Sequence, residues 1–341
     1  MIVGTAAHPF RPFEDWLRVA RLVEELGYGM TCQSQNPVLR GDPFVELGIA
    51  ARETRSVLLA TTVAVAGLVN PAIQAAAIAT VDDISHGRAV LGLGRGAATA
   101  AAIGESALSS AALEAYVVAL RDLLGGRAAT WRGSEVRLPW VTRPVPVILS
   151  AYGPRTLQLA GRCADGVLIA SAVAGPVLAE AIRSVRDSAD AAGRDPGDIA
   201  IWVTARASVG TDRDEALADL KAILAGSGRQ LDPNEPGMPV EYRLAIAELK
   251  ARYVETDHVV PGGANEALIE ELDLVDYLAG RFAITGTAEE CRAQFQAIAD
   301  LGVDCVFLNG AMRNEERMIV AVAEQVGVRY TQQGRAAPSA G

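Results

Sequence analysis

The sequence has few of the residues that build metal centres. Its 341 residues include four cysteines and three histidines, all scattered singly, with no pair in Cys-x-x-Cys spacing. Structural metal sites need clustered thiolate and imidazole ligands, so we expect no metal centre. Isolated cysteines of this kind are typical of small buried hydrophobes in a reducing compartment, which predicts a cytoplasmic location.

Positive charge is also scarce, because the net charge is −10 at pH 7. A nucleic-acid-binding surface needs clustered Lys and Arg, so we expect no nucleic-acid partner. Residues 56–81 carry no charged side chain, but Asn70-Pro71 breaks this stretch. A buried strand followed by a core-facing helix explains it better than a membrane span. The first residues lack the basic region of a signal peptide.

Short apolar runs alternate with longer amphipathic ones, a pattern typical of β–α units and a parallel sheet. Helices are predicted between the strands, including 43–53, 71–84, 154–163 and 288–301, the last with Thr287 as its N-cap. Eight strands favour a closed (β/α)8 TIM barrel over an open doubly wound sheet, for which six normally suffice. The predicted strands are residues 2–4, 29–34, 57–63, 89–93, 145–150, 166–170, 199–208 and 305–308.

We expect a single barrel domain over residues 1–330 and a flexible tail at 331–341. Two segments are longer than ordinary connections, 125–143 and about 225–285. Long insertions in a barrel are expected at its C-terminal rim, as excursions or lids.

Two segments carry the most chemical information. ISHGRAVLGLGRG, residues 84–96, ends a strand with glycines at alternate positions, which lets a large group approach the backbone. PVILSAYGPRTLQLAG, residues 146–161, joins a strand to a helix through a tight turn. The free amides and positive dipole of that helix start, beside Arg155 and Thr156, predict an anion site. By itself, the segment is equally consistent with an ordinary turn and a solvated arginine.

Together with ITGTAEECRAQFQAIADLGVD, residues 284–304, these segments resemble the luciferase-like flavin oxidoreductase superfamily. The order and spacing are most similar to its methylene-tetrahydromethanopterin reductase branch, which uses a deazaflavin coenzyme. The resemblance implies a TIM barrel with a flavin-like ring across the strand ends. It also implies a non-prolyl cis peptide at Thr62–Val63 and a homodimer through helices such as 71–84. The cofactor-binding residues that it implies are Thr62, Val63, Arg95, Gly96, Ala151, Tyr152, Gly153, Arg155 and Thr156.

The sequence departs from its relatives at the reactive end. Gln35 and Asn36 stand where relatives often carry an acid followed by histidine, and Ala97 stands where others carry an acid. Amide side chains orient a carbonyl or hydroxyl but do not transfer protons at neutral pH. We therefore take Gln35 and Asn36 as substrate-facing residues and His8 as a candidate for proton transfer. The plainer alternatives are a solvent-facing loop and a structural histidine.

The function that follows is hydride transfer between coenzyme F420, a deazaflavin, and a small organic substrate such as an imine, enone or carbonyl. The first alternative is an FMN-dependent monooxygenase. A second is a barrel that has lost catalysis and serves as a binding protein, which the missing acid and histidine make worth testing.

Overall fold

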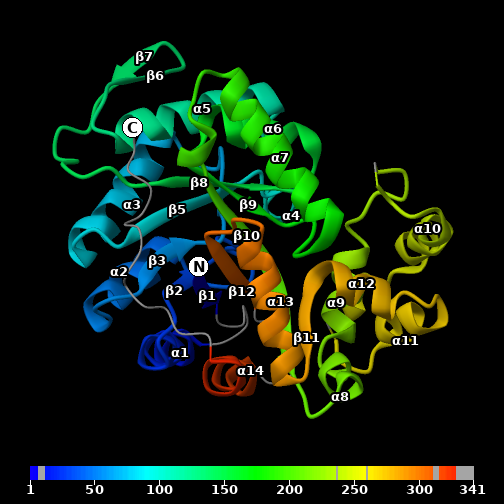
Figure 1. Cartoon of the computed structure of the whole chain (residues 1–341). Coiled ribbons are helices and arrows are strands. Elements are labelled where there is room, and N and C mark those ends of the chain that lie inside the picture. Colours follow the sequence, from blue (N-terminus) through cyan, green and yellow to red (C-terminus); the bar gives the residue numbers. More distant parts are fainter. Residues whose placement is uncertain (7–11, 236, 259, 310–314, 328–341) are drawn as a thin grey trace.

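The alternating segments fold into a closed parallel barrel (Figure 1). The computed structural model describes residues 1–6, 12–235, 237–258, 260–309 and 315–327. In this described part, eight parallel strands each pair with the next barrel strand, and the last pairs with the first, with Ile2 opposite Cys305. The predicted (β/α)8 TIM barrel is therefore confirmed. The barrel strands are β1 (Ile2–Ala6), β2 (Met30–Gln33), β3 (Leu58–Thr61), β5 (Ala89–Gly94), β8 (Val147–Ala151), β9 (Gly166–Ile169), β10 (Ala200–Val209) and β12 (Cys305–Asn309).

Helices lie between the strands and cover the outside of the barrel. Capping residues set several of their starts. Asp42 accepts hydrogen bonds from two amides in the first turn of α2, and Thr287 forms a capping box with Glu290 at α13, as its predicted N-cap role requires. No helix in the described part is long and apolar enough to span a bilayer. These helices are α1 (Phe13–Glu25), α2 (Pro43–Glu53), α3 (Pro71–Ser85), α4 (Ala97–Ala102), α5 (Ser110–Leu124), α6 (Pro154–Cys163), α7 (Gly175–Ala191), α13 (Ala288–Asp300) and α14 (Glu315–Ala321).

Side chains fill the barrel in two directions, because successive residues of a strand point to opposite faces. Inward positions form a lumen cluster that includes Met30, Trp202 and Phe307, each almost inaccessible to solvent. Outward positions pack against the helices in a larger cluster that includes Leu91 and Tyr116. Because the lumen is packed with apolar side chains, polar chemistry is left to the ends of the strands.

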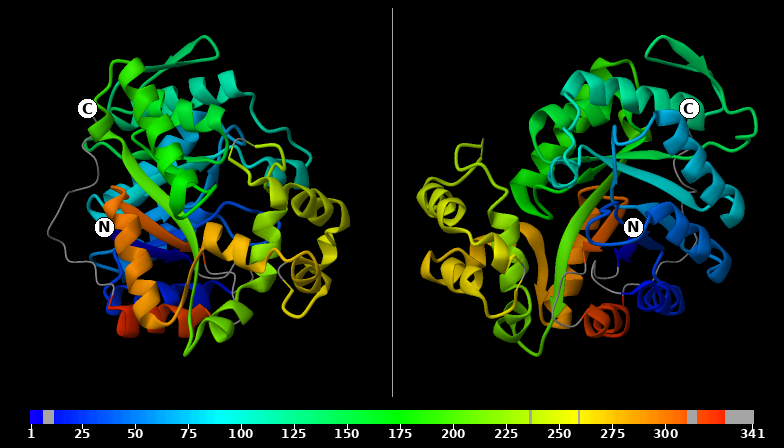
Figure 2. Two further views of the ribbon diagram at one scale, coloured as in Figure 1. Left: turned by 45° about the vertical axis from the view of Figure 1, so that its right-hand side comes forward. Right: turned by 180° about the vertical axis from the view of Figure 1, so that it is seen from behind.

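The segment 125–143 does not lie at the C-terminal rim, so that prediction is wrong. It follows helix α5 and precedes strand β8, and helix-to-strand connections lie at the N-terminal face of a barrel. Its hairpin of β6 (Ala129–Trp131) and β7 (Ser134–Val136) projects from the periphery in Figures 1 and 2. Arg143 follows the hairpin and pairs with Asp82, the buried carboxylate that also accepts the amide of Ala89 at the start of β5.

The longer insertion does lie on the rim side, between β10 and α13. It contains β11 (Ala283–Gly286), which pairs with the outer half of β10, and a group of helices that stands beside the barrel in Figure 2. Its apolar side chains form a separate cluster that includes Leu217 and Leu224. The insertion thus begins near residue 213 rather than 225, because the chain from Arg213 to Gly228 forms two helices that pack into this cluster. Its helices are α8 (Arg213–Ala218), α9 (Lys221–Gly228), α10 (Arg243–Arg252), α11 (Ala264–Glu271) and α12 (Val275–Phe282).

One buried arginine ties the insertion to the barrel. Arg281 of α12 donates from Nε to the carbonyl of Ser171, 2.9 Å away, in the loop after β9. Its Nη2 lies 2.5 Å from Glu235 Oε1, and its Nη1 lies 2.9 Å from the Tyr277 hydroxyl. The Arg281 side chain is only 5% exposed. Glu235 and Tyr277 belong to the insertion and fix the guanidinium in place, so the bond to the Ser171 carbonyl is the one that joins the insertion to the barrel.

A second arginine closes the N-terminal face of the barrel. Arg88, just before β5, donates to four backbone carbonyls at distances between 2.8 and 3.0 Å. The acceptors belong to α2, to α3 and to the chain entering β3, so one side chain joins three consecutive segments. They are the carbonyls of Ala51, Thr54, Val57 and Ser85.

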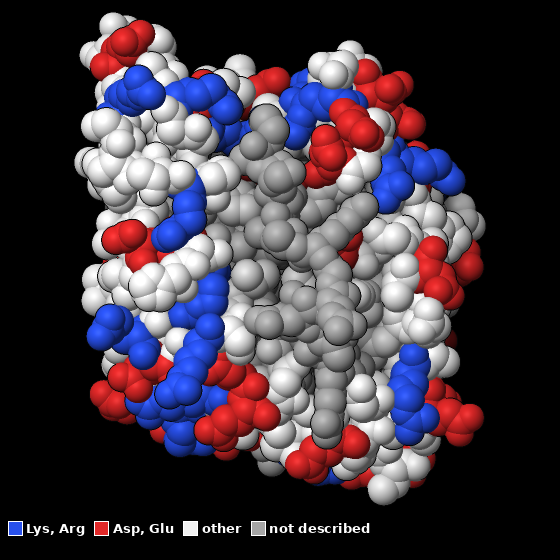
Figure 3. All heavy atoms as spheres, turned by 60° about the vertical axis from the view of Figure 1, so that its left-hand side comes forward, with Lys and Arg blue, Asp and Glu red and all other residues white. Residues whose placement is uncertain are grey.

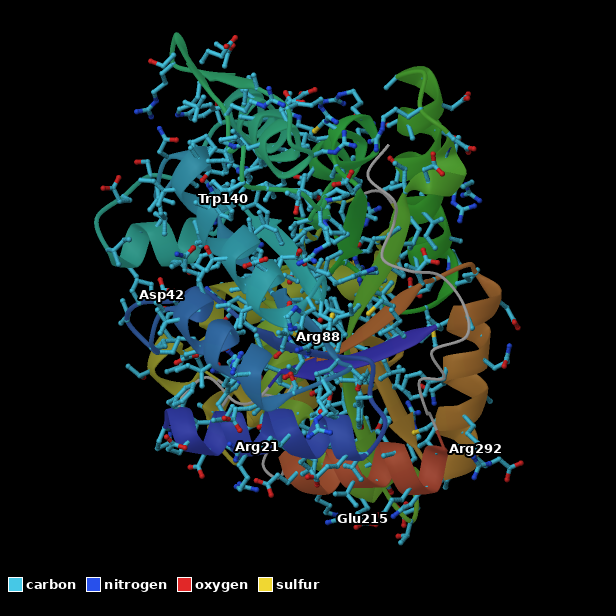
Figure 4. All side chains as sticks on the ribbon, turned by 90° about the vertical axis from the view of Figure 1, so that its left-hand side faces the viewer. Arg21, Asp42, Arg88, Trp140, Glu215 and Arg292 are labelled. Atoms are coloured by element: carbon cyan, nitrogen blue, oxygen red, sulfur yellow. The ribbon has the colours of Figure 1, made fainter. Side chains whose placement is uncertain are left out.

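Other arginines of the same region lie in exposed ion pairs. Figure 3 shows Lys and Arg side chains lying among Asp and Glu on one face of the molecule. Arg21 of α1, for example, lies 2.8 Å from Glu53, and these side chains are 46% and 43% exposed. Such pairs contribute little to stability, so Arg21 is a suitable control for Arg88, and both are labelled in Figure 4.

We expect Arg88→Met to lower the free energy of unfolding by about 3–5 kcal/mol, because several carbonyls lose a charged donor at once. Arg21→Met should cost less than about 1 kcal/mol. Urea unfolding followed by circular dichroism measures both values. Similar losses in the two variants would show that Arg88 does not hold this face together.

Candidate functional site

The C-terminal rim of the barrel contains an interrupted strand. β3 ends at Thr61, and pairing with β5 resumes only in β4 (Ala64–Val65). The peptide bond between Thr62 and Val63 is cis, as the family resemblance predicts. The Thr62 amide donates to the Gln33 carbonyl at 2.9 Å, so the interruption remains attached to β2.

The alternate glycines of β5 make room for this interrupted strand. A Cβ on Gly92 would stand 2.0 Å from the Thr61 carbonyl oxygen, and one on Gly94 would stand 2.7 Å from a methyl of Val63. Both distances are shorter than van der Waals contact allows. The large group that these glycines admit is therefore the neighbouring chain segment, which the sequence pattern alone does not identify.

Gln35 holds the other side of the interruption. The backbone N–H of Gln35 donates to the Val63 carbonyl at 3.0 Å, and its side-chain Oε1 accepts the backbone N–H of Val65 at 2.8 Å. Asn36 turns to its own loop, where Oδ1 accepts the amide of Val38 at 3.2 Å. Both predicted substrate-facing side chains thus bind backbone through their oxygens, and contact with substrate stays a prediction. His8 lies outside the described residues.

The start of α6 matches the predicted anion site in its local chemistry. Its N-cap is Gly153, which has no side chain to accept the first amides of the helix. Apart from its two chain neighbours, no described residue lies within 4 Å of where a Cβ on Gly153 would stand, and Arg155 in the first turn is exposed. Thr156 is half-buried beside it. This end of the helix therefore offers open space, a positive dipole end and a cation together.

Arg95 and Gly96, two more of the predicted cofactor-binding residues, make contacts within the chain, and their contact with a cofactor stays a prediction. Arg95 is exposed and donates from Nε to the Leu108 carbonyl at 3.1 Å, so its side chain contacts the segment before α5. Gly96 has φ +55° and abuts Val65, so it belongs with the interrupted strand. The structure thus brings together Gln35, Gly96 and the Thr62–Val63 bond. Ala151 is buried on the outward side of β8, and its predicted contact with a cofactor stays untested.

Tyr152 and Cys32 are two titratable groups at the inward side of the rim. Burial raises the pKa of the Cys32 thiol to about 12. Burial also raises the pKa of Tyr152, although 47% of the residue is exposed, because its surroundings solvate the phenolate poorly. Both groups therefore keep their protons at neutral pH. Among the described residues, no group of three or more His, Cys, Asp or Glu side chains could hold a metal ion.

Sequence reasoning missed one residue of the rim, Arg206 on β10. Strand alternation places Arg206 on the same face as Trp202, which lies in the lumen cluster. Its Nη1 is inaccessible to solvent and has no hydrogen-bond partner among the described residues. The signal was present in the sequence, because an arginine near the end of a mostly apolar strand is uncommon.

Comparisons with known proteins bear on this site. A model of the luciferase-like monooxygenase family matches residues 3–305. The 5,10-methylenetetrahydromethanopterin reductase of Methanolobus tindarius is 29% identical over 342 residues, which cover 96% of this chain and 99% of that protein. The structure of the coenzyme F420 dependent tetrahydromethanopterin reductase from Methanopyrus kandleri aligns with a TM-score of 0.75 at 21% identity, covering 95% of this chain and 98% of the other.

A monooxygenase from Streptomyces bottropensis also aligns, with a TM-score of 0.66 at 23% identity over 96% of this chain and 98% of the other. At these identities the two structural alignments show a shared fold. The family match spans most of the chain, and it confirms the resemblance that the glycine-rich strand and the α6 segment predict. The chain therefore belongs to the luciferase-like monooxygenase family of oxidoreductases.

Proposed function

We propose that the protein transfers hydride between coenzyme F420 and a small organic substrate with an imine, enone or carbonyl group. The observation that carries the proposal is the match to a methylenetetrahydromethanopterin reductase over almost the whole chain, together with the open helix start beside Arg155. Bound F420 would supply hydride transfer at a ring carbon, while the protein orients the ring and excludes water.

The residues present fit a cofactor that carries a phosphate. The exposed side chain of Arg155, its backbone amide and the hydroxyl of Thr156 are donors, and the space at Gly153 lets an oxyanion approach them. Gln35 would act as a positioning residue, because it fixes the backbone on both sides of the cis peptide. Asn36 and His8 remain our candidates for contact with substrate and for proton transfer.

An FMN-dependent monooxygenase is the second candidate. The likeness to the Streptomyces bottropensis monooxygenase favours it, and FMN carries a phosphate that the same helix start would accept. The third candidate, a binding protein without catalysis, rests on the absence of a titratable acid at positions 35, 36 and 97.

We also propose that two copies associate through α2 and α3. These helices pack on each other and expose large apolar side chains, of which Val45 is 63% and Ile73 is 61% exposed. Ile49 on α2 and Val69 just before α3 extend this apolar group. Exposed apolar side chains that gather on adjacent elements mark protein interfaces more often than single ones do.

Titration of the cofactor-free protein with F420 and with FMN tests the cofactor and its phosphate site together. We expect tighter binding of F420, and a loss of about tenfold or more in Arg155→Glu, because the reversed charge repels the phosphate. Arg183→Glu on α7 is the control, since it reverses an exposed charge elsewhere. Undiminished affinity in Arg155→Glu would place the phosphate elsewhere, and preferential FMN binding with oxygen consumption would favour the monooxygenase.

The positioning role of Gln35 is tested by two substitutions. Gln35→Leu removes the acceptor of the Val65 amide, and we expect F420 affinity to fall about five- to tenfold, the worth of one hydrogen bond. Gln35→Glu keeps an acceptor and should retain most of the affinity. Fluorescence titration measures both variants. Equal affinities in the leucine and glutamate variants would argue against this role.

The proposed homodimer predicts that Ile73→Asp yields monomers at micromolar concentration, because burying a carboxylate opposes association. Sedimentation velocity measures the mass. Leu244→Asp on α10, where the wild-type side chain is 83% exposed, is the control and should leave the dimer intact. A monomeric wild type, or a dimeric Ile73→Asp variant, would contradict the proposed interface.

A further inference from the structure

Arg206 carries a charge that the described protein does not neutralise. Its Nη1 is inaccessible to solvent and lacks a hydrogen-bond partner among the described residues. Burial lowers the pKa of its guanidinium, and the neighbouring Tyr152 opposes that shift. No carboxylate of the described chain contributes to the shift. Arg206 as a whole is half-buried, but this nitrogen is shielded from water and lacks an acceptor in the described chain. A buried donor without a partner costs free energy, so it calls for a partner that the described chain does not supply.

The position of Arg206 is set by the branching of β10. Along this strand, pairing with β9 extends to Val203, and pairing with β12 extends to Ala205. Arg206 is the first residue that pairs with β11 of the insertion, opposite Ala283. It therefore stands where the barrel wall ends and the insertion begins. Ligands of α/β proteins commonly bind in crevices at such divergence points.

The insertion brings a histidine and an ion pair near this point. Burial and the charge of Arg229 lower the pKa of His258, and the charge of Arg206 adds to this shift, so Arg206 and His258 lie within electrostatic reach of each other. The Nδ1 of His258 lies 2.6 Å from the hydroxyl of Tyr253, and the guanidinium of Arg229 lies 4.9 Å from the Tyr253 ring centroid. Glu255 pairs with Arg229 and offsets its charge. Because the lowered pKa keeps His258 neutral at pH 7, these neighbours leave the charge of Arg206 unbalanced.

We propose that Arg206 binds an anionic group, a carboxylate or a phosphate, carried by the substrate. The guanidinium can bind either group through two parallel hydrogen bonds, and Tyr152 offers a hydroxyl donor beside it. The phosphate of the cofactor is assigned to a different place, the start of α6 after β8. The identity of the molecule that carries the anion rests on the proposed function, whereas the anion site itself rests on Arg206.

The test is calorimetric titration with inorganic phosphate and with acetate, on the protein alone and on the protein saturated with F420. We expect wild type to bind at least one of these anions in both states. Arg206→Met should weaken that binding at least tenfold while leaving F420 affinity unchanged, and Arg206→Lys should lose less. Arg213→Met, which removes an exposed arginine at the start of the insertion, should bind the anion as wild type does.

The melting temperature separates ligand binding from a structural role. Because methionine relieves an unpaired buried charge, Arg206→Met should melt at or above the wild-type temperature in the absence of anions. A fall of several degrees would overturn the proposal, and so would equal anion affinity in wild type and Arg206→Met. Competition between phosphate and F420, with loss of F420 affinity in the variant, would assign the anion to the cofactor instead. If wild type fails to bind F420 the proposed function fails, while anion loss in Arg206→Met would still support the site.

Discussion

The contact between the Thr61 carbonyl and Gly92 is the constraint on which the rim depends. With a hydrogen in place of a side chain at Gly92, β5 lets the β3 backbone approach more closely than any other residue would allow. The Thr61 hydroxyl reinforces the approach by donating to the Gly92 carbonyl at 2.7 Å. After Thr61 the chain leaves the regular ladder of hydrogen bonds with β5, and Gln35 binds its backbone on the opposite side. The shape of the rim beside β2 and β5 is thus set by backbone packing, before any ligand is considered.

Much of the fold is predictable because it follows from periodicity and end signals. The eight barrel strands, the helix starts at Pro43 and Pro154 and the N-cap at Thr287 all follow from local chemistry. The cis peptide is predictable only through resemblance, since nothing in the residues themselves requires it. The location of 125–143 at the N-terminal face of the barrel was predictable as well, because a segment that connects a helix to the next strand lies at that face whatever its composition.

The site was less predictable because its side chains act through neighbours that are distant in sequence. Gln35 reads as a polar loop residue until its partner, Val65, is known to lie 2.8 Å away. The sequence suggests that the glycines of β5 make room for a ligand, although the segment that lies against them is the chain between β3 and β4. Arg206 stands out in the sequence as a charge in a mostly apolar strand, but its lack of a carboxylate partner becomes visible only in the fold.

The Arg281 contacts bear on how substrates enter and leave. If the insertion swung outward as a lid, its hydrogen bonds to the loop after β9 would have to break, from Arg281 Nε to the Ser171 carbonyl and from the Val173 amide to the Arg281 carbonyl. The pair with Glu235 lies within the insertion and would move with it. Two hydrogen bonds, one of them from a charged group, contribute about 2–4 kcal/mol, so roughly a few molecules in a hundred or fewer would be open in this way at any moment. The insertion is therefore a fixed wall beside the rim. Substrates must reach and leave the rim through motions smaller than an outward displacement of the whole insertion.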